Sequence, residues 1–190
     1  MAAPQGINIL NMTGSWTLNR SLSDDLDATF ALQGIPWIVR TIINYASLEI
    51  KMRQQPPSPP ERPTAVIDIN QIVRPGGFDT ANSYILDGET REDTVPIFGT
   101  IAMHCSYVKA ADVADEDSFG ASVERPLSDD ERIGIMEISE GVHTGWFTTT
   151  LWAFETVDGE RRFCKYCTTT KDDQKVQARL VYDYSPIDAE

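Results

Sequence analysis

The stretch VQARLVYDY, residues 176–184, alternates apolar and polar side chains almost without error, as a half-buried β-strand does. Near the start of the chain, Gly14-Ser15-Trp16 opens another amphipathic strand, and the sequence between them predicts one short helical insert followed by strands. A β-barrel closed around its own interior has this layout, because its first strand must meet its last if no edge is left unpaired. A barrel of about eight to ten strands has room for its side chains and one small ligand, so we expect the function to lie in its cavity.

Length and composition favour a single domain over residues 1–190. Apolar residues make up 41% of the chain and charged residues 24%, which is ordinary for a folded soluble protein. The net charge of -13 argues against binding to nucleic acid or to an anionic membrane surface. The N-terminus lacks a basic segment followed by an apolar run, and no stretch is apolar for long enough to span a bilayer, so a cytoplasmic location is expected. The sparse, odd set of three cysteines is typical of a reducing compartment.

Two short helices are predicted directly after the first strand. Ser23 is predicted to cap a helix over residues 24–33, whose first turn is acidic, and Gly34 ends it. Pro36 suits the start of a second helix over residues 36–43. These helices are expected to cover one end of the barrel.

From residue 46 onward the apolar residues recur with a period of two, which indicates strands. Asp158-Gly159 is the strongest hairpin signal, and hairpins between sequential antiparallel strands make an up-and-down barrel. The expected fold class is therefore all-β, an antiparallel up-and-down barrel with two short helices after the first strand. Residues 110–132 are acidic, lack periodicity and are expected to form a long loop, either a lid or a disordered segment. The remaining predicted segments are a tail over residues 1–12 and strands over residues 13–20, 46–53, 65–73, 81–86, 95–109, 145–157, 161–169 and 175–184.

Several motifs resemble those of the lipocalin and fatty-acid-binding-protein superfamily of ligand-binding barrels. They are Gly14-Ser15-Trp16, the two helices after the first strand and the ending Ala178-Arg179-Leu180-Val181-Tyr182-Asp183-Tyr184. More narrowly, a group of small fungal lipocalin-like proteins is similar at Leu22-Ser23-Asp24-Asp25, Leu32-Gln33-Gly34-Ile35-Pro36-Trp37 and Gly159-Glu160-Arg161-Arg162. Some members of that group are encoded beside polyketide and nonribosomal-peptide synthases. Those that have been studied resemble pericyclases, which fold a linear polyene and close it into rings.

The resemblance implies structural roles for Trp16 and Arg179. In that superfamily the tryptophan of the first strand plugs one end of the barrel beneath an arginine of the last strand, and a guanidinium over an indole gains cation–π attraction. Fatty-acid carriers of this type bind the ligand carboxylate through an arginine and a tyrosine two residues later. Here Val181 stands two residues after Arg179 and Tyr182 points the other way, so that clamp is not reproduced.

Motifs for other chemistries are weak or missing. Cys164 and Cys167 have a C-x-x-C spacing, but residues three apart on a strand face opposite sides, so two packed thiols are favoured over a zinc or redox site. With only His104 and His143, a histidine-rich metal site is excluded by count. The sequence has no G-x-S-x-G elbow, no G-x-G-x-x-G loop and no EF-hand spacing. We therefore expect neither a metal ion nor a cofactor.

The predicted strand over residues 145–157 suggests a ligand-binding wall. Tryptophan and threonine share one of its faces, and such a mixture suits a concave pocket better than a dry core. The sequence leaves open which face points inward, and a place in the core is the alternative for each aromatic residue. The predicted ligand-binding residues are Trp37, Met103, Trp146, Thr148, Thr150, Trp152 and Phe154.

A hydrogen-bond donor in the cavity could polarise a carbonyl of the ligand. The donors that we single out as catalytic candidates are Tyr84, Tyr166, Tyr182, His104 and Arg40. For His104, a solvent-facing position is the favoured alternative, because it lies on the strand face opposite Ile101 and Tyr107.

The leading hypothesis, given the resemblance, is a cofactor-independent pericyclase. It would promote an intramolecular Diels–Alder-type cycloaddition of a hydrophobic, polyketide-derived polyene. The alternatives are a carrier of a lipophilic small molecule without turnover, and an isomerase or dehydratase that uses a tyrosine or Asp68 as acid or base. The expected partner is a hydrophobic small molecule, with no nucleic acid and no membrane insertion. The oligomeric state is left open, with a homodimer among the options.

Overall fold

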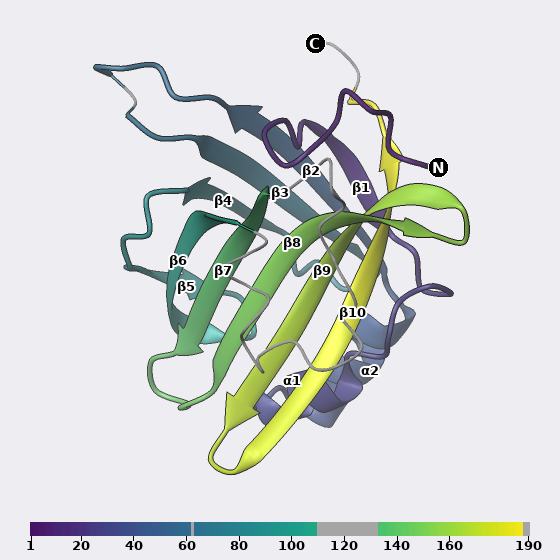
Figure 1. Ribbon diagram of the computed structural model, residues 1–190. Helices are drawn as coiled ribbons and strands as arrows, with labels where there is room; N and C mark the ends of the chain where they lie inside the picture. The colour runs from purple at the N-terminus through teal and green to yellow at the C-terminus, as the bar shows by residue number, and fades with distance from the viewer. Residues whose placement is uncertain (62, 110–132, 188–190) are drawn as a thin grey trace.

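The computed structural model describes residues 1–61, 63–109 and 133–187, which form one ten-stranded antiparallel sheet with two short helices (Figure 1). The sheet curls into a nearly closed barrel with the strand order β4-β3-β2-β1-β10-β9-β8-β7-β6-β5. The expected acidic loop over residues 110–132 lies outside the described residues. The strands are β1 (Gly14–Leu18), β2 (Ser47–Gln55), β3 (Val66–Arg74), β4 (Thr80–Ile85), β5 (Arg91–Val95), β6 (Gly99–Lys109), β7 (Ile133–Gly141), β8 (Phe147–Val157), β9 (Glu160–Lys171) and β10 (Gln174–Ser185).

Strands β1 and β10 pair with each other, as the sequence predicts. Trp16 lies opposite Tyr184 and Leu18 lies opposite Tyr182 in an antiparallel ladder. The other neighbours in the described sheet are consecutive strands. The prediction of an antiparallel up-and-down barrel is therefore confirmed.

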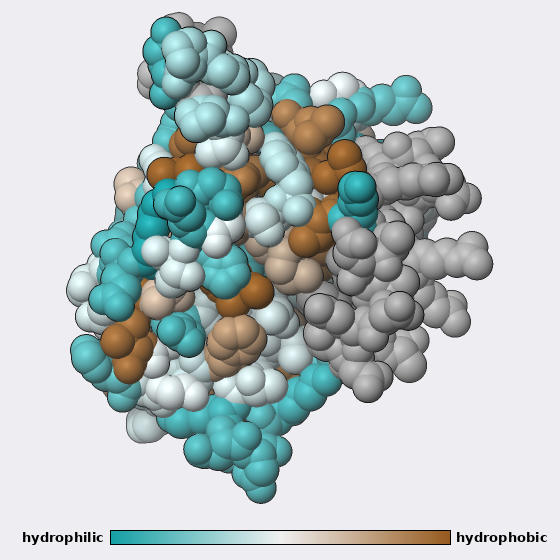
Figure 2. Space-filling view, turned by 60° about the vertical axis from the view of Figure 1, so that its left-hand side comes forward, coloured by the Kyte–Doolittle hydropathy of each residue, from teal (hydrophilic) through white to brown (hydrophobic). Residues whose placement is uncertain are grey.

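The ladder stops between β4 and β5, so the expectation that no strand edge is left unpaired is wrong. β4 pairs with β3 and β5 pairs with β6, but no ladder joins β4 to β5 in the part of the chain that the structure describes. β5 is short, and Arg91, Glu92 and Asp93 are exposed on it. Charges on a short edge strand oppose pairing with other chains. Figure 2, turned so that this side comes forward, shows apolar side chains at the surface between polar ones.

The helices α1 (Asp27–Leu32) and α2 (Trp37–Tyr45) lie at one end of the barrel, as expected (Figure 1). α1 begins later than predicted because Ser23 does not cap it. The Ser23 hydroxyl instead donates to the Asn19 carbonyl at 2.7 Å and accepts from the Val181 amide at 2.8 Å. Ser23 thus ties the segment after β1 to β10. No helix in the described chain is long and apolar enough to cross a membrane.

The middle of the chain differs from prediction in two ways. The single strand predicted over residues 95–109 is in fact the end of β5 and the whole of β6, because a turn through Ile97, with φ of 64°, separates them. β7 has no strand prediction at all. Its alternation is blurred because Gly134, Ile135 and Met136 are all buried, so apolar residues occupy both of its faces.

The core of the barrel is built around Trp16, which is fully buried. Its ring packs edge-on against Phe154, Phe163 and Tyr184, at centroid distances of 5.8, 5.2 and 5.1 Å. The indole Nε1 donates to the Met12 carbonyl at 3.0 Å. Edge-to-face ring pairs stabilise a core beyond the area that they bury. Trp16 therefore occupies a central structural position.

The contact expected between Arg179 and Trp16 is wrong. Arg179 lies on the outer face of β10, where its guanidinium bonds the Glu155 carboxylate at 3.3 Å. A cation that does contact the rings around Trp16 is Arg161, whose guanidinium carbon lies 4.0 Å from the centroid of the Phe154 ring. Trp16 is thus packed by aromatic rings rather than covered by the predicted arginine.

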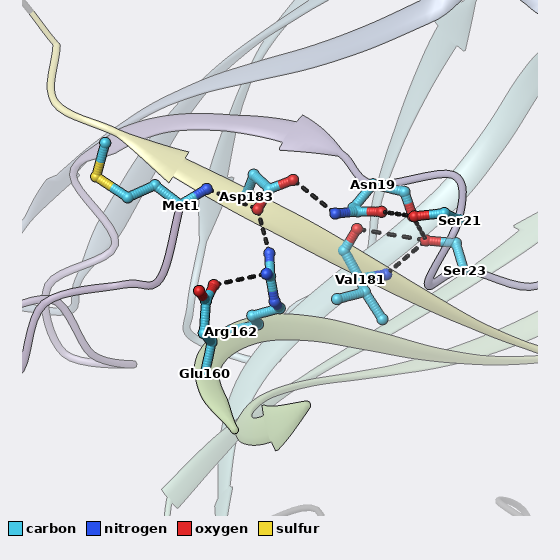
Figure 3. Close-up of polar contacts among 8 residues, drawn as sticks. All are labelled: Met1, Asn19, Ser21, Ser23, Glu160, Arg162, Val181 and Asp183. Atoms are coloured by element: carbon cyan, nitrogen blue, oxygen red, sulfur yellow. Dashed lines mark hydrogen bonds and ion pairs between the residues drawn. The ribbon is translucent and has the colours of Figure 1, made fainter. Parts of the chain in front are cut away.

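A polar network joins β10 to three other parts of the chain (Figure 3). The Asp183 carboxylate accepts hydrogen bonds from the Met1 amino group at 2.7 Å and from the Asn19 amide at 2.8 Å, and it also pairs with Arg162. Arg162 makes a second ion pair with Glu160 at 2.6 Å. Burial raises the pKa of Asp183, but the three donors outweigh burial and hold the pKa below its ordinary value.

We expect Trp16→Ala to lower the free energy of unfolding by about 3–5 kcal/mol, the range for deleting a buried aromatic side chain. Chemical denaturation measures this loss. Trp37→Ala is the matched control, because Trp37 is 69% exposed on α2. A wild-type denaturation midpoint for Trp16→Ala would contradict the central position of Trp16.

We expect Asp183→Asn to lower Tm at neutral pH, and the difference from wild type to shrink in acid. The pKa of Asp183 is lower in the folded state, so its ionised carboxylate stabilises the fold fully above the unfolded-state pKa near 3.8. That stabilisation is lost as the pH falls through the depressed folded-state pKa. Thermal unfolding across an acid pH series tests this, with the exposed Asp173→Asn as control. A Tm difference that stays constant with pH would rule out the linkage.

Candidate functional site

A cavity of about 460 Å³ lies inside the barrel beneath α1. Side chains of α1 and of the inner face of every described strand line it. Its volume falls within the range of about 300–1,000 Å³ that is usual for sites enclosing a small organic ligand. The cavity is the candidate functional site.

The face that mixes tryptophan with threonine, formed by Trp146 and β8, points inward. Trp152 and Phe154 continue this face in the buried core, without reaching the cavity surface. Trp37 is exposed on α2 and does not reach the cavity, so its predicted place in the ligand-binding wall is wrong. Four of the predicted ligand-binding residues line the cavity: Met103, Trp146, Thr148 and Thr150.

Alternation along the strands separates the three predicted tyrosine donors. Tyr84 and Tyr182 line the cavity. Tyr166 lies on the outer face of β9, where its hydroxyl donates to the Glu155 carboxylate. The catalytic assignment of Tyr166 is therefore wrong, because its neighbours along β9 are the residues that point inward.

The predicted donors His104 and Arg40 also lie away from the cavity. His104 faces outward, and its Nδ1 is 3.3 Å from the Thr90 hydroxyl. Arg40 is held by the Asp27 carboxylate between the two helices. Their catalytic assignments are wrong. Asp68, the acid or base of the isomerase alternative, accepts a hydrogen bond on the outer side of β3 and does not line the cavity either.

Two charged side chains, Glu137 of β7 and Lys165 of β9, line the cavity from inside the barrel. Lys165 Nζ lies 3.5 Å from Glu137 Oε2 and 3.9 Å from the centroid of the Trp152 ring. Glu137 Oε2 accepts a hydrogen bond of 2.8 Å from Trp152 Nε1, and the Tyr84 hydroxyl lies near enough for the charge of this carboxylate to raise the pKa of Tyr84. We call these four residues the interior polar cluster.

Burying opposite charges destabilises a fold unless hydrogen bonds compensate for the lost water. Only 13% of the Glu137 side chain and 14% of the Lys165 side chain are exposed. Trp152 Nε1 and the Lys165 ammonium both face the Glu137 carboxylate, and the ammonium gains cation–π attraction from the Trp152 ring. An ammonium has three N–H donors, and the ion pair engages at most one of them among the described residues. The others are available to a ligand.

Burial keeps the interior hydroxyls and the cavity thiol protonated. Burial, reinforced by the charge of Glu137, raises the pKa of Tyr84 well above its ordinary value, and burial raises that of Tyr182 likewise. Burial also raises the pKa of Cys167 to about 11, although the Thr150 hydroxyl bonds its sulfur. At neutral pH these groups are therefore hydrogen-bond donors rather than nucleophiles.

The three cysteines are free thiols. Cys164 belongs to an apolar cluster on the outer side of β7–β10, whereas Cys167 lines the cavity. The prediction that the C-x-x-C pair faces opposite sides of its strand is thus confirmed. Two side chains on opposite faces cannot bind one metal ion together.

A second polar region lies where α1 meets β8 and β9. Gln33 Nε2 donates to Thr148 Oγ1 at 3.3 Å, and Thr148 Oγ1 lies 2.8 Å from Thr169 Oγ1. The Phe98 ring, from the turn between β5 and β6, packs edge-on beside Trp146 at 6.3 Å. The cavity therefore combines two separate groups of polar side chains with aliphatic and aromatic walls.

Glu137 and Lys165 are candidates that no sequence prediction singled out. For Lys165 a signal exists: the Asp158-Gly159 hairpin places it opposite Trp152, so both must lie on one face of the sheet. Glu137 stands between two apolar residues of the unpredicted strand β7. A single charge inside an apolar run is the signal that could have identified it.

Two curated proteins are similar to this chain over nearly its whole length. "Probable pericyclase scpY" of Mollisia scopiformis is 23% identical over 189 residues, which cover 96% of this chain and 94% of that protein. "Pericyclase pydY" of Acremonium sp is 23% identical over 184 residues, which cover 97% of each chain. No protein-family model matches the chain.

Solved structures of ligand-binding barrels have the same fold. A Schistosoma mansoni fatty acid binding protein in complex with arachidonic acid superposes with a TM-score of 0.57 at 14% identity, covering 94% of this chain and 99% of that chain. The fluorescent protein UnaG superposes with a TM-score of 0.58 at 15% identity, covering 91% and 96%. The chain therefore has the calycin-like barrel of lipocalins and fatty-acid-binding proteins, and the curated proteins to which it is similar are named pericyclases.

Proposed function

We propose that this protein is a pericyclase, which closes a hydrophobic polyene into rings inside the barrel. The observation that carries the proposal is the interior polar cluster, in which an ammonium donor lines a cavity of about 460 Å³. Similarity to two proteins named pericyclase supports it. The reaction is an intramolecular Diels–Alder-type cycloaddition, in which a diene and an alkene of one molecule become a cyclohexene. The product is an isomer of the substrate, so no atom or electron has to be supplied.

Confinement supplies the first part of the proposed rate enhancement. A flexible polyene in water rarely adopts the folded conformer in which its diene and alkene meet. Side chains from several strands, such as Ile50 of β2 and Leu180 of β10, line the cavity and limit the conformers of the polyene that fit. Restricting conformers in this way can supply several kcal/mol, toward the lower part of the range for oriented intramolecular reactions.

Polarisation supplies the second part. A carbonyl conjugated to the reacting alkene withdraws more electron density when it accepts a hydrogen bond, and this lowers the barrier to closure. Lys165 is the donor that we assign to this role, with Tyr182 as a second donor on the cavity wall. Glu137 balances the charge of Lys165, and Tyr84 lies beside the Glu137 carboxylate.

A carrier without turnover is the second candidate, favoured by the similarity in fold to a fatty acid binding protein. The charges in the cavity oppose a fatty-acid ligand, because Glu137 already neutralises Lys165 and would repel a carboxylate. A neutral carbonyl ligand is therefore expected to bind better than a fatty acid. If the cavity performs acid–base isomerisation or dehydration instead, Glu137 is the carboxylate that a strand supplies to it, beside Asp24 and Asp25 from the segment before α1.

The decisive experiment incubates the purified protein with linear trienones, in which a conjugated diene is tethered to an enone, with apolar tails of increasing length. We expect cyclisation to be faster than in buffer and the ratio of stereoisomers to change. Chiral chromatography measures both. Trienones that bind while rate and ratio stay at their buffer values would reject the cyclase and leave the carrier.

We expect Lys165→Met to lower kcat roughly tenfold to a thousandfold with little change in KM, because a polarising hydrogen bond strengthens in the transition state. Lys165→Met leaves the Glu137 carboxylate buried without its partner, which destabilises a fold by roughly 3–5 kcal/mol. The double variant Glu137→Gln/Lys165→Met removes this buried charge and is therefore measured as well. Thermal unfolding confirms that each variant is folded. Lys51→Met, on the exposed side of β2, is the matched control. A loss confined to KM would assign Lys165 to the binding wall alone.

A further inference from the structure

We infer that the cavity wall formed by α1 and β8 is a binding subsite for an uncharged group that both donates and accepts hydrogen bonds, as a carboxamide does. Four cavity-lining residues make up this wall, which we call the α1 wall: Thr29, Gln33, Trp146 and Thr148. The inference deepens the proposed function, because it names a polar group of the ligand. Its test measures binding alone.

Three residues of the α1 wall carry a buried polar atom without a hydrogen-bond partner: Thr29 Oγ1, Gln33 Oε1 and Trp146 Nε1. These residues are only 5%, 9% and 3% exposed. Buried polar atoms in native proteins are almost always paired, and each exception calls for an explanation. Five such atoms occur in the described chain, and three of them lie in this one wall. A ligand group that pairs with them would relieve this penalty.

The orientation of the Gln33 amide does not remove the unpaired group. Gln33 Nε2 donates to Thr148 Oγ1 at 3.3 Å, which leaves Oε1 without a partner. If the amide were turned over, Oε1 would accept from Thr148 and the NH₂ group would be left instead. Thr148 Oγ1 also lies 2.8 Å from Thr169 Oγ1, and either of these two hydroxyls can be the donor. Rotation about the Gln33 side chain would turn the free end of the amide toward a ligand.

The unpaired atoms specify a neutral group with both hydrogen-bonding capacities. Gln33 Oε1 accepts and the Thr29 hydroxyl either donates or accepts, whereas Trp146 Nε1 lies against Gly141. The α1 wall contains no charged side chain, and Arg20, a cation elsewhere in the cavity lining, already donates to the Ala46 carbonyl at 3.1 Å. A charged ligand group buried there would lack compensation, whereas an amide would not.

Aromatic rings shield the α1 wall from water. Phe98 packs 6.3 Å from Trp146 on one side and 6.2 Å from Phe30 of α1 on the other. Hydrogen bonds strengthen in such a low-dielectric setting, and an unpaired group there becomes more unfavourable. The α1 wall therefore discriminates between a ligand that satisfies it and one that does not.

The test compares dodecanamide with the methyl ketone of the same length, by displacement of Nile red from the cavity. Wild type is expected to bind the amide at least about tenfold more tightly than the ketone, the effect of one rescued buried polar group. Gln33→Leu keeps the size of the side chain without its polar atoms and is expected to lose that preference. Gln174→Leu, at the exposed start of β10, is the control and should retain it.

Equal preference for the amide in wild type and Gln33→Leu would overturn the inference, with thermal unfolding used to show that the variant is folded. If the inference holds, Thr29→Val, which removes a second unpaired atom, weakens amide binding and leaves ketone binding unchanged. Tighter binding of dodecanoate than of dodecanamide by wild type would also overturn it, because the subsite would then take a charged group. Amide preference without any cyclisation would reject the proposed function but support the subsite. Cyclisation without amide preference would reject the subsite but support the proposed function.

Discussion

The ion pair between Glu137 and Lys165 is the interaction on which the candidate site depends. Neither charge could be buried alone in this barrel, because the desolvation penalty of an isolated ion exceeds the free energy gained from packing its side chain. The pair forms because β8 lies between β7 and β9 in register, which brings both side chains over Trp152. Tyr84 reaches the same carboxylate from β4, across the barrel. A polar, electrically balanced patch thus persists inside a largely apolar interior.

Most of the fold follows from the period of two along the strands. The alternation of residues 176–184 and the Asp158-Gly159 hairpin predict the last strands and their pairing, but not which of their faces points inward. β7 was not predicted as a strand because apolar residues occupy both of its faces, so its sequence shows no clear alternation. The error at Arg179 has a different origin. Arg179 and Tyr182 are three residues apart on one strand and cannot both face inward, so placing Arg179 over Trp16 by resemblance conflicted with proposing Tyr182 as a donor in the cavity.

The site was less predictable than the fold, for a physical reason. Aromatic and hydroxyl residues such as Trp146 and Thr148 suggest a pocket because they suit both water and apolar ligands. Charged residues such as Lys165 are assigned to the surface by default, since they are almost never buried unless paired. The partner that permits burial comes from β7, and the pairing of β7 and β9 with β8 brings the two side chains together. The hairpin register places Lys165 on the same face as Trp152, but it does not identify Glu137 as its partner.

The positions of the two polar regions bear on what kind of ligand the cavity suits. A carrier of fatty acids needs one site for one charged head group, whereas this cavity offers a neutralised ion pair and, separately, the uncharged α1 wall. A ligand that meets both regions is held at two points, which limits the conformers of the chain between them. Limiting the conformers of the ligand does not help a carrier, because a carrier must release its ligand and two sets of hydrogen bonds slow release. For an intramolecular ring closure, the same restriction removes part of the entropic barrier. The arrangement of polar groups therefore favours turnover over carriage.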